Sequence, residues 1–325
     1  MDASYDFIRN HKSPMPQLND THGTPCAGIV AAKRHGKCGS GVAYSAKVSG
    51  IRLCGSDENQ AHSTHALQHE NQKNDIYSCS WGPGDDVSKT YPISDTVSRV
   101  LEEGTMLGRN GRGNIFVFSS GNSALKSDNC AFNGYANSIY TITVGAVDKH
   151  GNRVQYSEGC SSLMTMAYAS NFGSFDIHTT ANIECRPDFA GTSAATPMVS
   201  GVIALVLSRR PELTWRDIQH LLVRSARRTD INHNSWFRTY HGRFFSNQYG
   251  FGVVDGETLL SLLTTHRLVE NQVTIESQYF EKNAYLPNTK QGYRDSFQVS
   301  RELLKPNDKM ILEHVVVTFT LTCQQ

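Results

Sequence analysis

The sequence predicts an α/β fold in which a mostly parallel sheet is covered by helices on both faces, followed by the start of a second, β-rich domain. Short β-type runs alternate with helix-like stretches over most of the chain, which is typical of parallel sheets. After about residue 267 the pattern becomes polar and loop-rich, and then alternates as LEHVVVTFTLTC. A length of 325 residues is sufficient for one large domain and part of another.

The predicted elements of the first domain follow one another in regular order. Strands are expected at residues 47–53, 75–81, 114–120 and 139–147. One helix is expected to begin at His22, another near residues 94–109, and a third at Ser193. In folds of this class, functional sites gather at the carboxyl ends of the strands.

The predicted domain boundary lies between residues 265 and 266. Residues 266–325 contain one clear strand, which is still in progress at Cys323, and so short a segment is not expected to close a core of its own. We therefore expect the chain to be incomplete at both ends.

Composition excludes several classes of protein. The chain is 38% hydrophobic and 19% charged, with a formal net charge of +1, which favours an ordinary globular protein and gives no footprint for nucleic acid or an anionic membrane. There is no run of 18 apolar residues, and the first twenty positions lack the regions of a signal peptide. Eight cysteines without a CxxC pair disfavour zinc and suit either disulfides or buried thiols.

The strongest chemical signal is a serine among small residues at the start of an apolar helix, GTSAATP at 191–197. Small neighbours allow a substrate backbone to approach the Ser193 hydroxyl, and the amino end of the helix favours developing negative charge. An ordinary serine helix cap would give the same local pattern.

Two further residues have the chemistry to assist such a serine. His22 begins a helix rich in small residues and has the pKa to accept a proton near neutral pH. Asn122 follows a hydrophobic strand, where its amide can donate to an oxyanion. Taken singly, a structural histidine and an asparagine in a turn are the simpler interpretations.

Together, the histidine, asparagine and serine resemble the order found in subtilisins, and the surrounding residues resemble the kexin and furin-like proprotein convertases. The resemblance covers roughly residues 3–265, and LEHVVVTFTL looks like the early core of that family's P domain. The segments that carry it, in the family's order, are HGTPCAG, DIYSCSWGP, GRGNIFVFSSGN, GYANSIYTITVGAVD, YSEGCSS, GTSAATP, LTWRDIQHL and YGFGVVD.

The resemblance implies a three-layer subtilisin-like domain and a role for each candidate residue. Ser193 would attack the scissile carbonyl, His22 would transfer the proton, and Asn122 would hold the oxyanion. The family's disulfides would correspond to Cys38 with Cys185 and to Cys130 with Cys160, with Cys26 a thiol behind His22. These pairings, and the family, imply secretion, an inhibitory prosegment and proprotein substrates with basic residues.

The same resemblance draws attention to a missing residue. The family's catalytic aspartate lies well upstream of the histidine, whereas only 21 residues precede His22, and neither Asp2 nor Asp6 matches it. Without that carboxylate the expected deficit in turnover is about 10⁴. We therefore expect the chain as given to be nearly inert.

The family's calcium site and basic specificity are matched in part. Asp85, Asp128 and Glu158 correspond to the ligands of a Ca²⁺ ion under the specificity pocket. For a substrate arginine at P1, Asp85 supplies one pocket carboxylate, but Asn133 replaces the other. Asp20 matches a position that reads the P2 residue.

Three hypotheses follow from these matches. The first is a calcium-dependent kexin-like endopeptidase that acts after Lys-Arg or Arg-Arg sites in the secretory pathway. The second is a non-catalytic relative that binds peptides or a partner protein, which the missing acid and residues such as Asn133 and Phe189 favour. A purely structural secreted domain explains none of the coincident motifs.

Overall fold

The computed structural model describes residues 3–17, 19–34, 37–53, 60–84, 89–182, 184–276 and 311–317. The chain forms two compact units, the first of which ends at Leu268 and the second of which begins at Val269. The boundary is close to the predicted one, and the identity of the second unit as a P domain stays a prediction.

The first unit is built on a four-stranded parallel sheet in the order β3 (Ile76–Cys79), β4 (Ile115–Ser119), β5 (Thr141–Val147) and β6 (Leu163–Tyr168). The predicted parallel α/β sheet is thus confirmed. Three of these strands were expected, and β6 was not.

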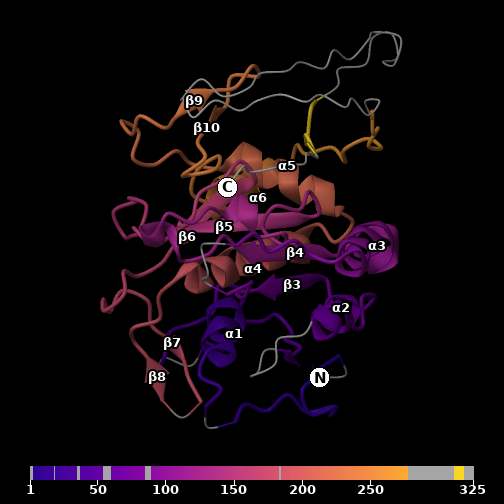
Figure 1. Ribbon diagram of the computed structural model, residues 1–325, viewed down its shortest axis with the longest axis vertical. Coiled ribbons are helices and arrows are strands. Elements are labelled where there is room, and N and C mark those ends of the chain that lie inside the picture. The colour runs from indigo at the N-terminus through magenta and orange to yellow at the C-terminus, as the bar shows by residue number, and fades with distance from the viewer. Residues whose placement is uncertain are drawn as a thin grey trace, which may run out of the picture. The chain divides into compact units, whose positions relative to one another are not determined.

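Helices cover both faces of this sheet (Figure 1). Alternate side chains of β4 separate into two cores, as the two-residue period of a strand requires. Ile115 and Val117 pack in the core that contains α4 (Thr192–Arg209) and α5 (Trp215–Ser225). Phe116 and Phe118 pack in the opposite core, against α3 (Asp95–Gly111) and α2 (Gln60–Gln68). The molecule therefore has the three layers that the sequence predicts.

The cap residues of three helices determine where those helices begin. The Ser94 side chain accepts from the backbone N–H of Val97 at the start of α3. Thr214 and Asp217 form a reciprocal capping box at the start of α5. The Asp255 side chain accepts from Thr258 at the start of α6 (Gly256–Leu262). Each cap satisfies an N–H group that the first helical turn leaves unpaired.

Helix α4 is the central helix of the fold, since it packs against all four strands of the sheet and against α1 (Gly23–Ala31). By length and hydropathy it could cross a bilayer, but 67% of the relevant window is buried within the protein. That burial is typical of the core helix of a globular domain. The polypeptide enters α4 through Gly191, whose φ of +86° favours glycine.

Short strand pairs lie around this core. β1 (Tyr5–Asp6) pairs with β2 (Ile51–Arg52), β7 (Thr179–Thr180) with β8 (Cys185–Arg186), and β9 (Phe237–Arg238) with β10 (Phe244–Phe245). Two short 3₁₀ helices, Ala124–Lys126 and Cys130–Phe132, follow β4. The predicted strand at residues 47–53 is therefore only two residues long.

The second unit contains no regular secondary structure in the parts that are described, residues 269–276 and 311–317. The strand predicted to begin at Leu312 is thus wrong as far as Val317, and the remainder, with Cys323, lies outside the described residues. Alternating apolar side chains provide a strand with a buried face, but a strand also needs a hydrogen-bonding neighbour, and Val315, Val316 and Val317 are about 70% exposed.

Candidate active site

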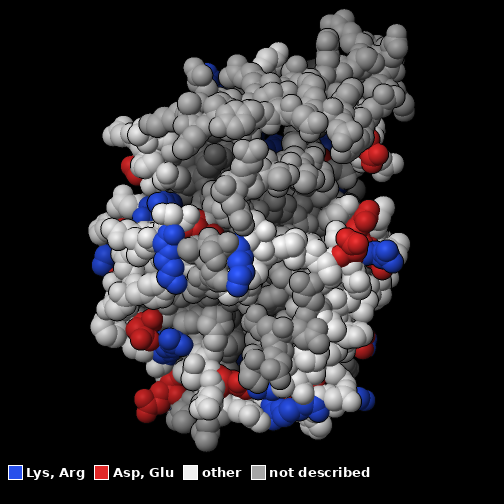
Figure 2. Space-filling model, viewed as in Figure 1, with Lys and Arg blue, Asp and Glu red and all other residues white. Residues whose placement is uncertain are grey.

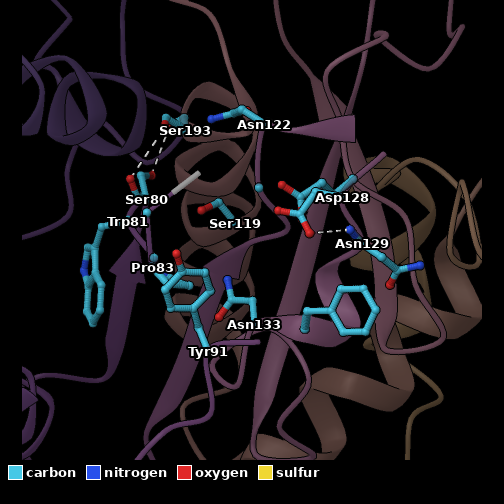
Figure 3. A pocket seen from close by; sticks show the side chains of 15 residues that line it. Ser80, Trp81, Pro83, Tyr91, Ser119, Asn122, Asp128, Asn129, Asn133 and Ser193 are labelled. Carbon is cyan, nitrogen blue, oxygen red and sulfur yellow. Dashed lines mark hydrogen bonds between the residues drawn. The ribbon is translucent and has the colours of Figure 1, made fainter. Parts of the chain in front are cut away.

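Two of the three predicted catalytic residues, Asn122 and Ser193, meet at the carboxyl ends of the parallel strands. Ser80 follows β3, Asn122 follows β4, and Ser193 lies in the first turn of α4. All three line one cavity of about 140 Å³ (Figure 3). The site therefore occupies the edge of the sheet that the fold class favours.

The Ser193 side chain is nearly buried, with 8% of the residue exposed. Its hydroxyl donates to the Ser80 carbonyl at 3.4 Å, and the Ser80 hydroxyl donates to the Ser193 carbonyl at 3.1 Å. Because Ser193 is in the first helical turn, its backbone N–H has no intrahelical acceptor. That N–H and the positive end of the helix dipole are available to a developing oxyanion.

Asn122 is held by its carbonyl oxygen, which accepts from the backbone N–H of Thr192 at 2.8 Å and from the Thr192 hydroxyl at 3.0 Å. These two donors determine which end of the amide is oxygen. The amide nitrogen is consequently directed toward Ser193 (Figure 3). Asn122 has the orientation that an oxyanion donor requires.

A second side chain, which the sequence analysis did not single out, also holds the turn before the nucleophile. The Tyr156 hydroxyl accepts from the backbone N–H of Gly191 at 3.0 Å and donates to the Ser170 carbonyl at 2.6 Å. Burial raises the pKa of Tyr156 to about 12, so the phenol remains protonated and able to donate. The only sequence signal was its place in the YSEGCSS segment.

Replacing Tyr156 with phenylalanine is expected to destabilise the protein by about 1–3 kcal/mol, because the buried Gly191 N–H loses its acceptor. Slower reaction of Ser193 with a fluorophosphonate is expected as well. Urea unfolding and the labelling rate measure the two effects, with Tyr240→Phe as the control, because Tyr240 is fully exposed. Identical behaviour of the two variants would show that the Tyr156 hydroxyl does not hold the turn.

His22 immediately precedes α1. The Cys26 side chain contacts both His22 and the backbone of Ser193. The Cys26 sulfur lies 3.9 Å from His22 Nδ1 and 3.7 Å from the Ser193 carbonyl oxygen. The structure describes both His22 and Ser193, and no hydrogen bond joins their side chains. Hydrogen bonds between catalytic residues are often long before substrate binds. Desolvation raises the pKa of the half-buried Cys26 thiol to about 11, so the thiol is neutral.

The environment of His22 favours the uncharged imidazole. His22 is exposed, but the surrounding protein still desolvates the ring, and this desolvation, together with the charge of Arg186, lowers the pKa of His22. A depressed pKa preserves the neutral form, which is the one that can accept a proton, down to a lower pH.

Within the part of the chain that the structure describes, no carboxylate accepts a hydrogen bond from His22. Asp6, fully buried, is instead bound by Arg9 and Arg52. It therefore does not orient the imidazole, in agreement with its mismatch to the family pattern.

Asp20, the candidate P2-reading residue, is already paired. Arg52 Nε donates to Asp20 Oδ2 at 2.9 Å, as does the backbone N–H of Gln17. The Gln17 hydrogen bond and Arg52 lower the pKa of Asp20. Asp20 thus anchors the loop before His22, and contact with a substrate side chain stays a prediction.

The candidate calcium ligands lie in part around the same cavity. Asp128 and Glu158 both line it, while Asp85 lies outside the described residues. Glu158 is 5% exposed and sits under Gly121, where an added Cβ would come within 2.2 Å of a carboxylate oxygen. Oxygen-only donors fit Ca²⁺, although two carboxylates are fewer than its usual six to eight ligands. No cluster of three His, Cys, Asp or Glu occurs among the residues described.

Asn133 presents its amide nitrogen to the cavity. Its side-chain oxygen accepts from the backbone N–H groups of Tyr135 at 3.0 Å and Ala136 at 3.4 Å. The nitrogen is consequently turned toward Gly82. A Cβ added to Gly82 would lie 3.1 Å from the Asn133 amide nitrogen. A donor thus occupies the position where the family would have a carboxylate.

The structure forms both disulfides that the resemblance implies. Cys38 is joined to Cys185, and Cys130 to Cys160. Cys26 is not in a disulfide, and Cys54 and Cys323 lie outside the described residues. The first disulfide connects the segment after α1 with the strand that precedes Ser193.

Comparison with known proteins places this arrangement among peptidases. The subtilase family model matches residues 1–252. The chain is 39% identical to Protease KEX1 of Kluyveromyces lactis and to kexin of Saccharomyces cerevisiae, in each case over 98% of its own length. It is 36% identical to mouse proprotein convertase subtilisin/kexin type 7, over 99% of its length. The chain spans only 42% of the length of Protease KEX1, 39% of that of kexin and 43% of that of the mouse convertase.

Solved structures show the same fold. A serine protease of Aeromonas sobria superposes with a TM-score of 0.76 at 24% identity, covering 83% of this chain and 58% of that one. Its complex with a chaperone gives the same score at 22% identity, covering 83% of this chain and 57% of that one. The chain therefore belongs to the subtilase family, within which it is similar to the kexins and proprotein convertases.

Proposed function

We propose that this chain carries the catalytic residues of a kexin-like serine endopeptidase that hydrolyses peptide bonds after Lys-Arg or Arg-Arg sites in secretory proproteins. One observation carries the proposal: Ser193 and Asn122 share a cavity with the carboxylates of Asp128 and Glu158, and Cys26 links His22 to Ser193. The proposed nucleophile and oxyanion donor thus lie beside two carboxylates, and the proposed base contacts Cys26 next to them.

The reaction would follow from these positions. The Ser193 hydroxyl attacks the scissile carbonyl carbon while His22 accepts its proton, and the carbonyl oxygen becomes an oxyanion. The Asn122 amide nitrogen and the Ser193 backbone N–H stabilise that charge. His22 then returns the proton to the leaving amine. Water next attacks the acyl-enzyme while His22 accepts its proton, and His22 gives that proton to the departing Ser193 oxygen.

Charge favours a basic substrate side chain. The described residues that line the cavity include two carboxylates and no lysine or arginine. On the face shown in Figure 2, by contrast, basic and acidic side chains are interspersed. Calcium, held by Asp128, Glu158 and Asp85, would neutralise part of the charge beneath the pocket and stiffen it.

Two observations favour the alternative, a non-catalytic relative that binds peptides. The Ser193 hydroxyl donates to Ser80 rather than to His22, and no described carboxylate orients His22. We accordingly propose that turnover by the chain as given is slow, by about 10⁴ relative to a complete triad.

The distinguishing experiment measures hydrolysis and binding of a fluorogenic Lys-Arg peptide by the full chain, in calcium. Slow hydrolysis that a fluorophosphonate abolishes supports the peptidase. Binding without any hydrolysis above that of Ser193→Ala supports the alternative. Neither binding nor hydrolysis of basic peptides contradicts both.

Replacing Asn133 with aspartate is expected to raise kcat/KM for a P1 arginine by about tenfold, because one charge-assisted hydrogen bond is gained. An otherwise identical peptide with P1 glutamine should show no gain. Asn137→Asp is the matched control, since it adds the same charge in the same segment at an exposed site. An equal gain in both variants would mean that net charge, not the pocket, is responsible.

The complete protein would work in the secretory pathway with an inhibitory prosegment. The two disulfides support an oxidising compartment. The similarity to kexins and proprotein convertases supports proproteins as substrates.

A further inference from the structure

Arg186 lies beside His22, outside the cavity that holds Ser193. The cavity lining includes Ser193 and Asn122 but neither His22 nor Arg186. His22 and Arg186 therefore both lie outside the cavity that contains the two carboxylates. Because His22 protonates the leaving amine, the part of a substrate that follows the scissile bond must pass close to His22.

A stack of three side chains places the guanidinium there. The Phe189 ring packs edge-on against the His22 ring, with centroids 5.6 Å apart. The Arg186 guanidinium lies over the same Phe189 ring, 5.1 Å from its centroid. Phe189 is only 2% exposed, so this contact is made on a rigid part of the core.

Two hydrogen bonds fix the orientation of Arg186. Its Nη1 donates to the Thr21 carbonyl at 3.1 Å, in the residue directly before His22, and its Nε donates to Asp188 at 3.2 Å. Arg186 also ends β8 and follows Cys185, which is disulfide-bonded to Cys38. The side chain is thus held both by its own segment and by the segment that precedes His22.

The guanidinium retains unused hydrogen-bonding capacity. Arginine has five N–H donors, and the described structure uses one on Nε and one on Nη1. Nη2 has no partner among the described residues, and the side chain is 34% exposed. A cation held in place with free donors is well suited to a carboxylate.

We propose that Arg186 forms a subsite for an acidic side chain on the leaving-group side of the scissile bond, within the first two residues after it. The inference depends on the proposed function for the direction in which the substrate lies. It adds a substrate preference that the acidic pocket cannot provide: basic residues before the bond and an aspartate or glutamate after it.

The test uses the full chain with Ser193→Ala, so that peptides bind without being consumed. Two labelled peptides contain Lys-Arg followed by two residues, which are glutamate in one peptide and glutamine in the other. Fluorescence anisotropy at low salt should show about fivefold tighter binding of the glutamate peptide, the value for one well-placed ion pair. Adding Arg186→Gln should equalise the two affinities.

Arg227→Gln is the matched control, because Arg227 is an exposed arginine that donates instead to the Tyr168 hydroxyl. It should leave the glutamate preference intact. Equal binding of both peptides to the Ser193→Ala protein overturns the subsite, as does a glutamate preference that survives Arg186→Gln. Failure of the unaltered chain to cleave either peptide would instead contradict the peptidase, and the comparison of affinities would still stand.

Discussion

Replacing Ser193 with alanine is expected to remove the hydrolysis of basic peptides, and the size of the loss reports on His22. In a complete triad, removing the serine lowers kcat by about 10⁶, whereas removing the orienting acid alone costs about 3 × 10⁴. The two effects are strongly non-additive, because the residues act as a unit. Because His22 has no carboxylate partner among the described residues, Ser193→Ala should therefore cost only about 10².

The measurement is peptide hydrolysis by the unaltered chain and by Ser193→Ala, at equal concentration and with circular dichroism to verify folding. A loss of about 10² agrees with the environment of His22 described above. A loss near 10⁶ would mean that a carboxylate outside the described residues serves the imidazole. No loss at all would exclude Ser193 as the nucleophile.

Asn122→Asp is expected to lower kcat by about 10²–10³ with little change in KM. The aspartate keeps an oxygen for the two bonds from Thr192, so the turn before Ser193 remains held. What is lost is the amide nitrogen, the donor directed toward Ser193. A carboxylate oxygen in its place would also repel the oxyanion.

Asn122→Ala provides the comparison that separates the two roles of Asn122. It removes both the donor and the acceptor, so it should lower kcat similarly and also lower the free energy of unfolding by about 1 kcal/mol. Should Asn122→Asp retain full activity, the nitrogen would not be an oxyanion donor, and Asn122 would serve only to position Thr192.

The parts of the site that depend on local sequence could be predicted. Ser193 and Asn122 stand directly at element ends, where a short run of small residues determines the backbone, and both lie as expected. The apolar run of β4 likewise predicts a strand, because either face of it meets a core. Local pattern was sufficient in these cases.

The rest depends on contacts between distant segments, which a single sequence does not reveal. Asp20 is paired with Arg52, 32 residues away, and this pairing depends on the loops around β2. Tyr156 reaches Gly191 only once the strands are assembled. The expected strand at Leu312 was wrong as far as it is described, because an alternating pattern does not specify a partner.

The Cys38–Cys185 disulfide has a consequence for the stability of the protein. It closes a loop across 147 residues of sequence, and such a long covalent closure restricts the unfolded chain by an amount equivalent to about 5 kcal/mol. That is a large share of the stability of an ordinary domain. Reduction of this disulfide would therefore lower the free energy of unfolding by up to that amount, because the unfolded chain regains conformational freedom.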